Sequence, residues 1–250
     1  MTEAHEANGV PRGTPDADVA AQVFGDRTAL ASRYHAWLAG AGVERGLLGP
    51  REVPRLWERH ILNSVAVAEL VGQGASVVDI GAGAGLPGIP LALRRPDLQI
   101  TLVEPLLRRA TFLDEVVADL ELGNVVVRRA RAEELPRAAW SVATARAVAP
   151  LGKLAGWLLP LVVPGGLVAA LKGASAAEEL ERDAAVLRRL GATTLAVREV
   201  GGVDGIPVAT AVTMLRALEP ARLPSRGARS NPRPASRSGP NRPRGGRPRG

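Results

Sequence analysis

The spacing of hydrophobic positions changes near residue 73, and this change divides the chain into two predicted parts. Before it, apolar residues recur every three or four positions, which predicts helices over residues 18–39 and 53–71. After it, short β-branched runs alternate with segments of helical spacing. The pattern therefore predicts a small N-terminal helical cap, residues 16–72, followed by an α/β domain, residues 73–219.

The α/β domain is expected to contain seven strands joined mainly by helices. The predicted strands are residues 76–80, 99–104, 125–129, 141–146, 167–172, 193–200 and 208–218. The predicted helices are residues 85–95, 106–122, 132–135, 151–163 and 176–190. Helical connections imply right-handed crossovers and a mainly parallel sheet covered on both faces. Residues 201–207 are too few for a crossover helix, so the last two strands should form a reversed, antiparallel hairpin at one edge.

Both ends of the chain lack hydrophobic periodicity. Residues 1–15 are polar and contain glycine and proline, which predicts a disordered N-terminus. Residues 220–250 combine nine arginines with proline, glycine and serine and contain no acid, which predicts a disordered basic tail. The tail accounts for the formal net charge of +7, because the rest of the chain carries −2. It is either a cationic arm for RNA phosphates or an extension that reflects the arginine-rich composition of the protein.

Composition excludes several kinds of chemistry. The chain has no cysteine, which excludes disulfides, cysteine nucleophiles and thiolate-bound iron–sulfur clusters and suggests a cytoplasmic protein. Its three histidines, His5, His35 and His60, are too scattered to predict a metal site. Residues 154–171 form an uncharged run of membrane-spanning length, but prolines and a Gly-Gly pair interrupt it, which predicts a helix, a turn and a buried strand instead. We expect a monomer with no membrane span and no metal.

A glycine-rich turn joins the first predicted strand to the helix that follows it. The stretch reads Val77-Val78-Asp79-Ile80-Gly81-Ala82-Gly83-Ala84-Gly85-Leu86-Pro87-Gly88. Glycine tolerates positive φ and lets backbone N–H groups approach a ligand, and the N-terminus of the next helix favours an anionic or polar group. The stretch therefore predicts a cofactor site, with a ligand-free structural turn as the alternative.

Two cofactors fit this turn. The spacing Gly83-x-Gly85-x-x-Gly88 satisfies the dinucleotide fingerprint, with Glu104 at a suitable distance to hold a ribose. The longer pattern that begins at Asp79 is instead similar to that of Rossmann-like methyltransferases that use S-adenosylmethionine (SAM). In that class the acid before the first glycine lies near the methionine end of SAM, and the acid that closes the second strand takes the ribose hydroxyls. The two prolines after the turn and the reversed edge hairpin favour SAM over NAD.

Further polar residues are expected at the same edge of the sheet, because ligands bind beyond the carboxyl ends of parallel strands where the strand order reverses. These ends carry Arg131-Ala132-Glu133-Glu134, Arg146 and Lys172. Arg146 follows an apolar strand, where an unpaired charge is costly, so we predict a function for it. The two glutamates have a structural alternative as a solvated helix start, and Lys172 as a side chain that extends to water.

The residues after the fourth strand also disfavour one reaction. Enzymes that methylate the amino group of adenine typically have an Asn/Asp-Pro-Pro-aromatic motif there, whereas this chain has Ala145-Arg146-Ala147-Val148. A ring nitrogen with an exposed lone pair, such as N7 of guanine, needs no general base. Its methylation mainly requires alignment and desolvation, which suits a site poor in acid–base residues.

Together these features resemble one family, the bacterial 16S rRNA guanine-N7 methyltransferases, once called glucose-inhibited division protein B. The segments that carry the resemblance are Arg59-His60-Ile61-Leu62-Asn63-Ser64, Val78 to Leu91 with its Gly-Leu-Pro-Gly-Ile-Pro sequence, Arg131-Ala132-Glu133-Glu134, Ala145-Arg146-Ala147 and Ala170-Leu171-Lys172-Gly173. The resemblance implies a Rossmann-like fold, SAM as methyl donor and a guanine in small-subunit rRNA as acceptor.

The resemblance also implies roles for individual residues. The cofactor residues it implies, together with those of the SAM pattern, are Asp79, Gly81, Gly83, Leu86, Glu104, Ala132, Glu133 and Arg146. We expect Arg146 as the catalytic residue near the methyl-transfer centre. We expect His60, Asn63 and Lys172 on the RNA side, although His60, Asn63 and Ser64 are equally compatible with a structural cluster. The rival hypotheses are an NAD-dependent oxidoreductase and a non-catalytic RNA-binding module.

Overall fold

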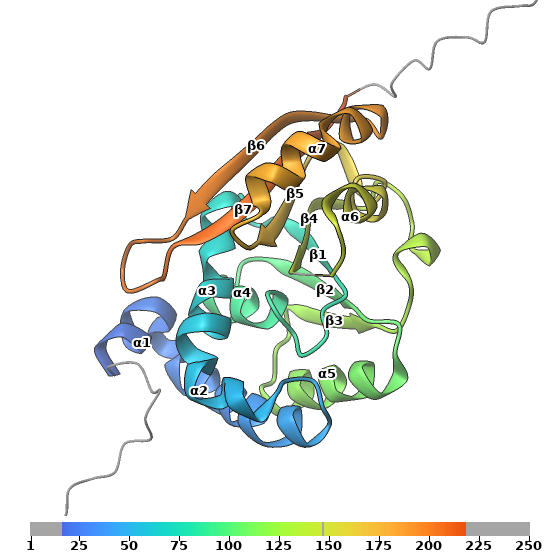
Figure 1. The fold of residues 1–250 in the computed structure, drawn as a ribbon. Coiled ribbons are helices and arrows are strands. Elements are labelled where there is room, and N and C mark those ends of the chain that lie inside the picture. The colour runs from blue at the N-terminus through green and yellow to red at the C-terminus, as the bar shows by residue number, and fades with distance from the viewer. Residues whose placement is uncertain (1–16, 147, 219–250) are drawn as a thin grey trace, which may run out of the picture.

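Seven strands form a single sheet in the order β3-β2-β1-β4-β5-β7-β6 (Figure 1). The computed structural model describes residues 17–146 and 148–218, so the predicted disordered regions, 1–15 and 220–250, lie outside the described residues. The strands are β1 (Ser76–Ile80), β2 (Gln99–Val103), β3 (Val125–Arg128), β4 (Trp140–Arg146), β5 (Val162–Lys172), β6 (Ala192–Val200) and β7 (Ala209–Arg216).

The first five strands are parallel, and β7 runs antiparallel to its neighbours β5 and β6. The predicted mainly parallel sheet with a reversed edge hairpin is confirmed. The chain moves outward from β1 through β2 to β3 and then returns to β4, which pairs with the other side of β1. The strand order therefore reverses between β1 and β4, and the carboxyl ends of these two strands flank the expected ligand crevice.

Helices cover both faces of the sheet. The helices of the α/β region are α4 (Gly88–Arg94), α5 (Leu107–Asp119), η6 (Ala132–Glu134), α6 (Leu151–Leu158) and α7 (Ala176–Arg189). One core joins α4, α5 and the cap to one sheet face, and a second core joins α6 and α7 to the other. None of the described helices is both long and apolar enough to cross a membrane.

The N-terminal cap is built from short segments that include 3₁₀ and π turns. They are α1 (Ala17–Phe24), η1 (Gly25–Arg27), α2 (Thr28–Trp37), η2 (Leu38–Gly42), η3 (Pro50–Arg55), η4 (Leu56–Leu62), α3 (Asn63–Val65) and η5 (Ala66–Leu70). Apolar side chains of the cap such as Tyr34, Leu56 and Ile61 are fully buried in the same core as β1 and β2. Cap and sheet therefore share one hydrophobic core.

The helix after β4 is shorter than the sequence predicts. We expected it over residues 151–163, but α6 ends at Leu158 and β5 begins at Val162. Pro160 cannot continue a helix, and Val162 pairs instead with Trp140 at the start of β4. The uncharged run at 154–171 thus forms a helix, a turn and a strand, as the sequence predicts.

Candidate cofactor and substrate site

Asp79, the acid before the glycine turn, is buried beneath it and binds the first N–H of the helix that follows. Its side chain is fully buried, and its Oδ2 accepts the N–H of Gly88 at 2.9 Å. A Cβ on Gly88 would collide with Leu102 and approach Asp79 Oδ2 to 2.8 Å, so only glycine fits here. The predicted helix start at residue 85 is therefore wrong. The chain continues as a turn to Gly88, and the first N–H of α4 is used by Asp79 rather than by a ligand.

The second oxygen of Asp79 is an unusual feature of this turn. Oδ1 is buried and meets no hydrogen-bond donor in the described part of the chain. Burial, which disfavours the charged form, raises the pKa of Asp79 to about 7 despite the opposing hydrogen bond from Gly88. The carboxyl lies below the turn and is 0% exposed, so it does not face the cavity above.

Glu104 follows β2 directly, and its carboxylate stabilises the glycine turn through a hydrogen bond. Its Oε2 accepts the N–H of Gly83 and its Oε1 the N–H of Leu106, each at 3.1 Å. The side chain of Arg109 lies 3.9 Å from Oε2. A carboxylate has about four lone-pair sites, so Glu104 retains acceptor capacity for the hydroxyl groups of a ligand.

A cavity of about 850 Å³, which we call the cofactor cleft, opens above the carboxyl ends of the central strands. Five of the eight predicted cofactor residues line it, namely Gly81, Glu104, Ala132, Glu133 and Arg146. The other three, Asp79, Gly83 and Leu86, are not among its lining residues. Gly83 instead supports Glu104, and Leu86 is buried in the core beneath the turn.

Gly81 stands where the turn meets the cleft. Its φ is +70°, a conformation that L-residues rarely adopt, and a Cβ there would lie 3.0 Å from the side chain of Val148. Tyr34 of the cap donates a hydrogen bond of 2.8 Å to the carbonyl of Ala84. The turn is therefore held between sheet and cap, with its glycine backbone at the cleft.

The helix α6 contributes two cleft residues that the sequence analysis missed. Lys153 and Trp157 line the cofactor cleft, and the Lys153 ammonium lies 5.1 Å from the Trp157 ring centroid. The sequence feature that could have revealed them is their four-residue spacing, which places both side chains on one face of the helix that follows β4. Glu134, by contrast, accepts the backbone N–H of Arg131, so its structural interpretation as part of a helix start is the correct one.

Arg146 extends from the end of β4 to the cap, where it is held by four hydrogen bonds. Its Nη1 donates to the His60 carbonyl at 3.1 Å and to Ser64 Oγ at 3.0 Å. Its Nη2 donates to the Arg59 carbonyl at 3.0 Å and to His60 Nδ1 at 2.9 Å. Burial lowers the pKa of Arg146 from its ordinary value. Sheet and cap are thus joined at the crevice by one guanidinium.

His60 is part of this link. Its Nε2 lies 2.7 Å from Glu52 Oε2, and its Nδ1 accepts from Arg146, so the ring is neutral with its proton on Nε2. Burial is the main cause that lowers the pKa of His60, and the charge of Arg146 acts in the same direction. Both ring nitrogens are used inside the protein. The geometry therefore supports the structural alternative for His60 and Ser64 rather than an RNA contact.

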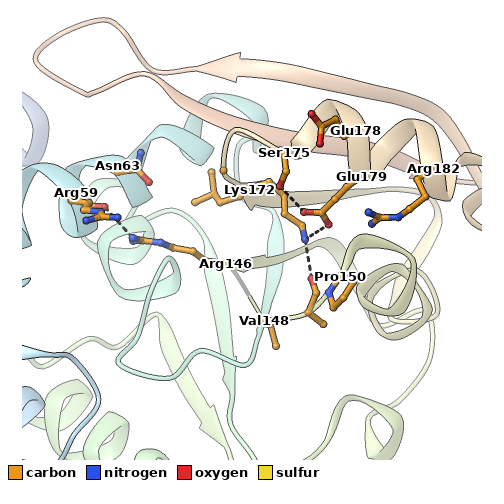
Figure 2. Close-up of a pocket in the computed structure, with 13 residues that line it drawn as sticks. Arg59, Asn63, Arg146, Val148, Pro150, Lys172, Ser175, Glu178, Glu179 and Arg182 are labelled. Carbon is orange, nitrogen blue, oxygen red and sulfur yellow. Dashed lines mark hydrogen bonds and ion pairs between the residues drawn. The ribbon is translucent and has the colours of Figure 1, made fainter.

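A second cavity of about 740 Å³ shares lining residues with the cofactor cleft. Figure 2 shows the residues that line this second cavity. Arg146 and Val148 line both cavities, and Asn63 and Lys172 line the second. The Lys172 ammonium is not free, because it donates to Glu179 Oε2 and to the Ala149 carbonyl at 2.8 Å each. Its side chain is only 6% exposed, so Lys172 does not extend to water. The predicted single crevice is thus two adjoining cavities.

Metal binding finds no support in the described ranges, 17–146 and 148–218. Within them no group of three or more His, Asp or Glu side chains is arranged to hold an ion.

Comparisons with known proteins identify the family of this chain. The sequence profile of the family described as rRNA small subunit methyltransferase G matches residues 27–205. Ribosomal RNA small subunit methyltransferase G of Rhodococcus jostii is 55% identical over 216 residues, which cover 85% of this chain and 94% of that protein. The protein of the same name from Corynebacterium jeikeium is 58% identical over 192 residues, 76% of this chain and 86% of that one.

A solved structure of a SAM-dependent methyltransferase from Aquifex aeolicus has a TM-score of 0.50 at 19% identity, covering 66% of this chain and 94% of that chain. That likeness supports the Rossmann-like fold alone. The family profile, in contrast, extends from the cap through the glycine turn, Glu104 and Arg146 to the edge hairpin. Because it spans well over half of the sequence, the chain belongs to the rRNA small subunit methyltransferase G family.

Proposed function

We propose that this protein transfers the methyl group of SAM to N7 of a guanine in 16S rRNA, either in the free RNA or in the small ribosomal subunit. The observation that carries the proposal is the pair of adjoining cavities at the point where the strand order reverses. Two substrates must meet in a methyl transfer, and the shared wall at Arg146 and Val148 provides the place. A ribosomal substrate also supports a cytoplasmic location.

The residues of the cofactor cleft fit SAM. Its volume of about 850 Å³ lies within the usual range for ligand sites. Glu104 would accept the ribose hydroxyls, Ala132 and Glu133 would flank the adenine, and the glycine backbone at Gly81 would lie at the methionine end. When bound, SAM supplies a methyl group on a positively charged sulfur.

Arg146 is better suited to positioning than to catalysis. Methylation at N7 leaves a positive charge on the guanine, and a nearby cation does not stabilise that charge. The hydrogen bonds of Arg146 instead fix the cap residues Arg59 to Ser64 against β4, at the wall between the cavities. No general base is required, because N7 carries an exposed lone pair.

The function is tested with purified protein, tritium-labelled SAM and 16S rRNA from cells that lack the enzyme, presented both as naked RNA and as assembled small subunits. We expect label in 7-methylguanosine after digestion and nucleoside mapping of at least one substrate. Binding of NADH without binding of SAM would instead support the oxidoreductase. RNA binding without methyl transfer to either substrate would support the non-catalytic module.

Replacing Glu104 by glutamine is expected to raise the Kd for SAM by about 10- to 100-fold, because hydrogen bonds to a charged group contribute about 1.5–3 kcal/mol. A glutamine amide can accept from only one of the two N–H groups that Glu104 now binds, and it brings donors towards them. Isothermal titration measures the Kd. The control is Glu181→Gln, an exposed residue of α7 outside both cavities. An unchanged Kd in Glu104→Gln would exclude the carboxylate from cofactor binding.

A further inference from the structure

The second cavity is the candidate for the acceptor base. It adjoins the cofactor cleft along the wall formed by Arg146 and Val148, and it is bounded on its other side by the start of α7 (Figure 2). A base that enters it can present one edge to the cleft and another to α7. The charged side chains of the cavity therefore decide which base fits.

Cations predominate in the lining. The charged lining residues are Arg59, Arg146, Lys172, Glu178, Glu179 and Arg182. Two of these cations are committed within the protein, Arg146 to the cap and Lys172 to Glu179. Arg59 pairs with Glu52 at 3.6 Å, and Arg182 donates to Asp183 at 3.1 Å, but both arginine side chains are 59% exposed and keep further N–H groups for a ligand. They stand on opposite sides of the cavity and suit the phosphates on either side of a nucleotide (Figure 2).

The two acids of the cavity differ in their availability. Glu179 accepts hydrogen bonds from Lys172 Nζ, from Ser175 Oγ and from the N–H of Leu151. Glu178 is exposed, and its carboxylate forms no hydrogen bond or ion pair with another described residue. Figure 2 shows the contacts of Glu179 as dashed lines, whereas none reaches Glu178. Glu178 is therefore the carboxylate that remains available to a ligand.

We propose that the second cavity receives the acceptor guanine, with its N7 edge at the Arg146 wall and its N1–H and N2–H groups donating to the carboxylate of Glu178. This inference rests on the proposed function and adds the determinant of base choice. Guanine carries two adjacent donors on its Watson–Crick edge, opposite N7, and a carboxylate accepts both. Adenine carries an acceptor at N1 and no amino group at C2, so a carboxylate does not pair with that edge. Glu178 thus selects guanine while N7 stays free to react.

The test is a double-mutant cycle between the protein and the base. 16S rRNA is assembled by ligation with either guanosine or inosine at the methylated position, because inosine lacks only the N2 amino group. It is used in the naked or subunit form that proves active with the wild type. We expect Glu178→Gln to lower kcat/KM on guanosine by about 10- to 100-fold, as for loss of a bidentate base contact. Inosine should lower it about tenfold with the wild type and less than about threefold with Glu178→Gln.

Each outcome of the cycle has a distinct meaning. If the wild type methylates neither substrate, the proposed function itself is wrong. If the wild type methylates guanosine but Glu178→Gln shows the same rate or the same inosine penalty, the proposed function stands and the base contact is wrong. Glu181→Gln, three residues further along α7 and outside the lining, is the matched control and should behave as the wild type. The Kd for SAM should be unchanged in both variants, because neither residue lines the cofactor cleft.

Discussion

Replacing Arg146 by methionine is expected to lower kcat/KM for rRNA methylation by about 100-fold, because a displacement of the reacting groups by about 1 Å costs a factor of this size. Methionine fills similar space but donates no hydrogen bond. The carbonyls of Arg59 and His60 and the hydroxyl of Ser64 then lose their donor at the wall between the two cavities. Initial rates with labelled SAM at several rRNA concentrations measure the effect.

The lysine variant separates geometry from charge. Lysine keeps the positive charge, but one ammonium cannot reproduce four hydrogen bonds in the planar arrangement of a guanidinium. If Arg146 positions the wall, Arg146→Lys should stay within about tenfold of Arg146→Met. A lysine variant with nearly wild-type activity would show that charge alone is required, and a fully active methionine variant would remove Arg146 from the site. Circular dichroism of both variants checks that the cap still folds.

The architecture was largely predictable because it depends on local patterns. Strand runs, helical spacing and the short link at 201–207 indicated a parallel sheet with a reversed edge, and the structure has that sheet. The errors fall where a tertiary contact overrides the local signal. The N–H of Gly88 donates to Asp79, and the helix begins there rather than at Gly85. Val162 pairs with β4, so β5 begins within residues that have helical spacing.

The site was only partly predictable, for a related reason. The sequence identifies which residues follow which strands, and Gly81, Glu104, Ala132, Glu133 and Arg146 do line one cleft. It does not show which polar groups are satisfied by partners far along the chain. Lys172 meets Glu179 within a short segment, yet Arg146 finds its partners more than eighty residues away in the cap. A charged residue next to an apolar strand therefore indicates a buried partner as readily as a ligand.

Glu178 illustrates the converse. Glu178 is one of several charged residues on α7, and in the sequence it looks like an ordinary solvent-facing residue of a helix. Its position in the sequence gives no sign of a role. Only the folded chain shows that the start of α7 bounds a cavity that adjoins the cofactor cleft at Arg146 and Val148. Exposed acids at the rim of a nucleic-acid enzyme are therefore informative when their neighbours are already paired.

Replacing Asp79 by asparagine is expected to change how the stability of the protein depends on pH. The pKa of Asp79 rises from 3.8 to about 7 in the folded state because the buried carboxyl resists ionisation. The folded state therefore binds its proton more tightly than the unfolded state, so this group weakens folding as pH rises from about 4 to about 7. At 1.36 kcal/mol per unit, the full loss is about 4 kcal/mol above pH 7.

Asparagine does not ionise and can still accept the N–H of Gly88 through its carbonyl, although its amide hydrogens would enter the place where Oδ1 has no partner among the described residues. The destabilisation caused by these amide hydrogens is the same at every pH. The free energy of unfolding of Asp79→Asn relative to the wild type should therefore increase by about 2–3 kcal/mol between pH 5 and pH 8. Urea unfolding at pH 5, 6, 7 and 8 measures it, with Asp114→Asn, an exposed residue of α5, as the control whose difference should stay constant. A difference for Asp79→Asn that is also constant would mean that Asp79 ionises in the folded protein as readily as in the unfolded chain, and that the glycine turn carries a charge beneath it at every pH tested.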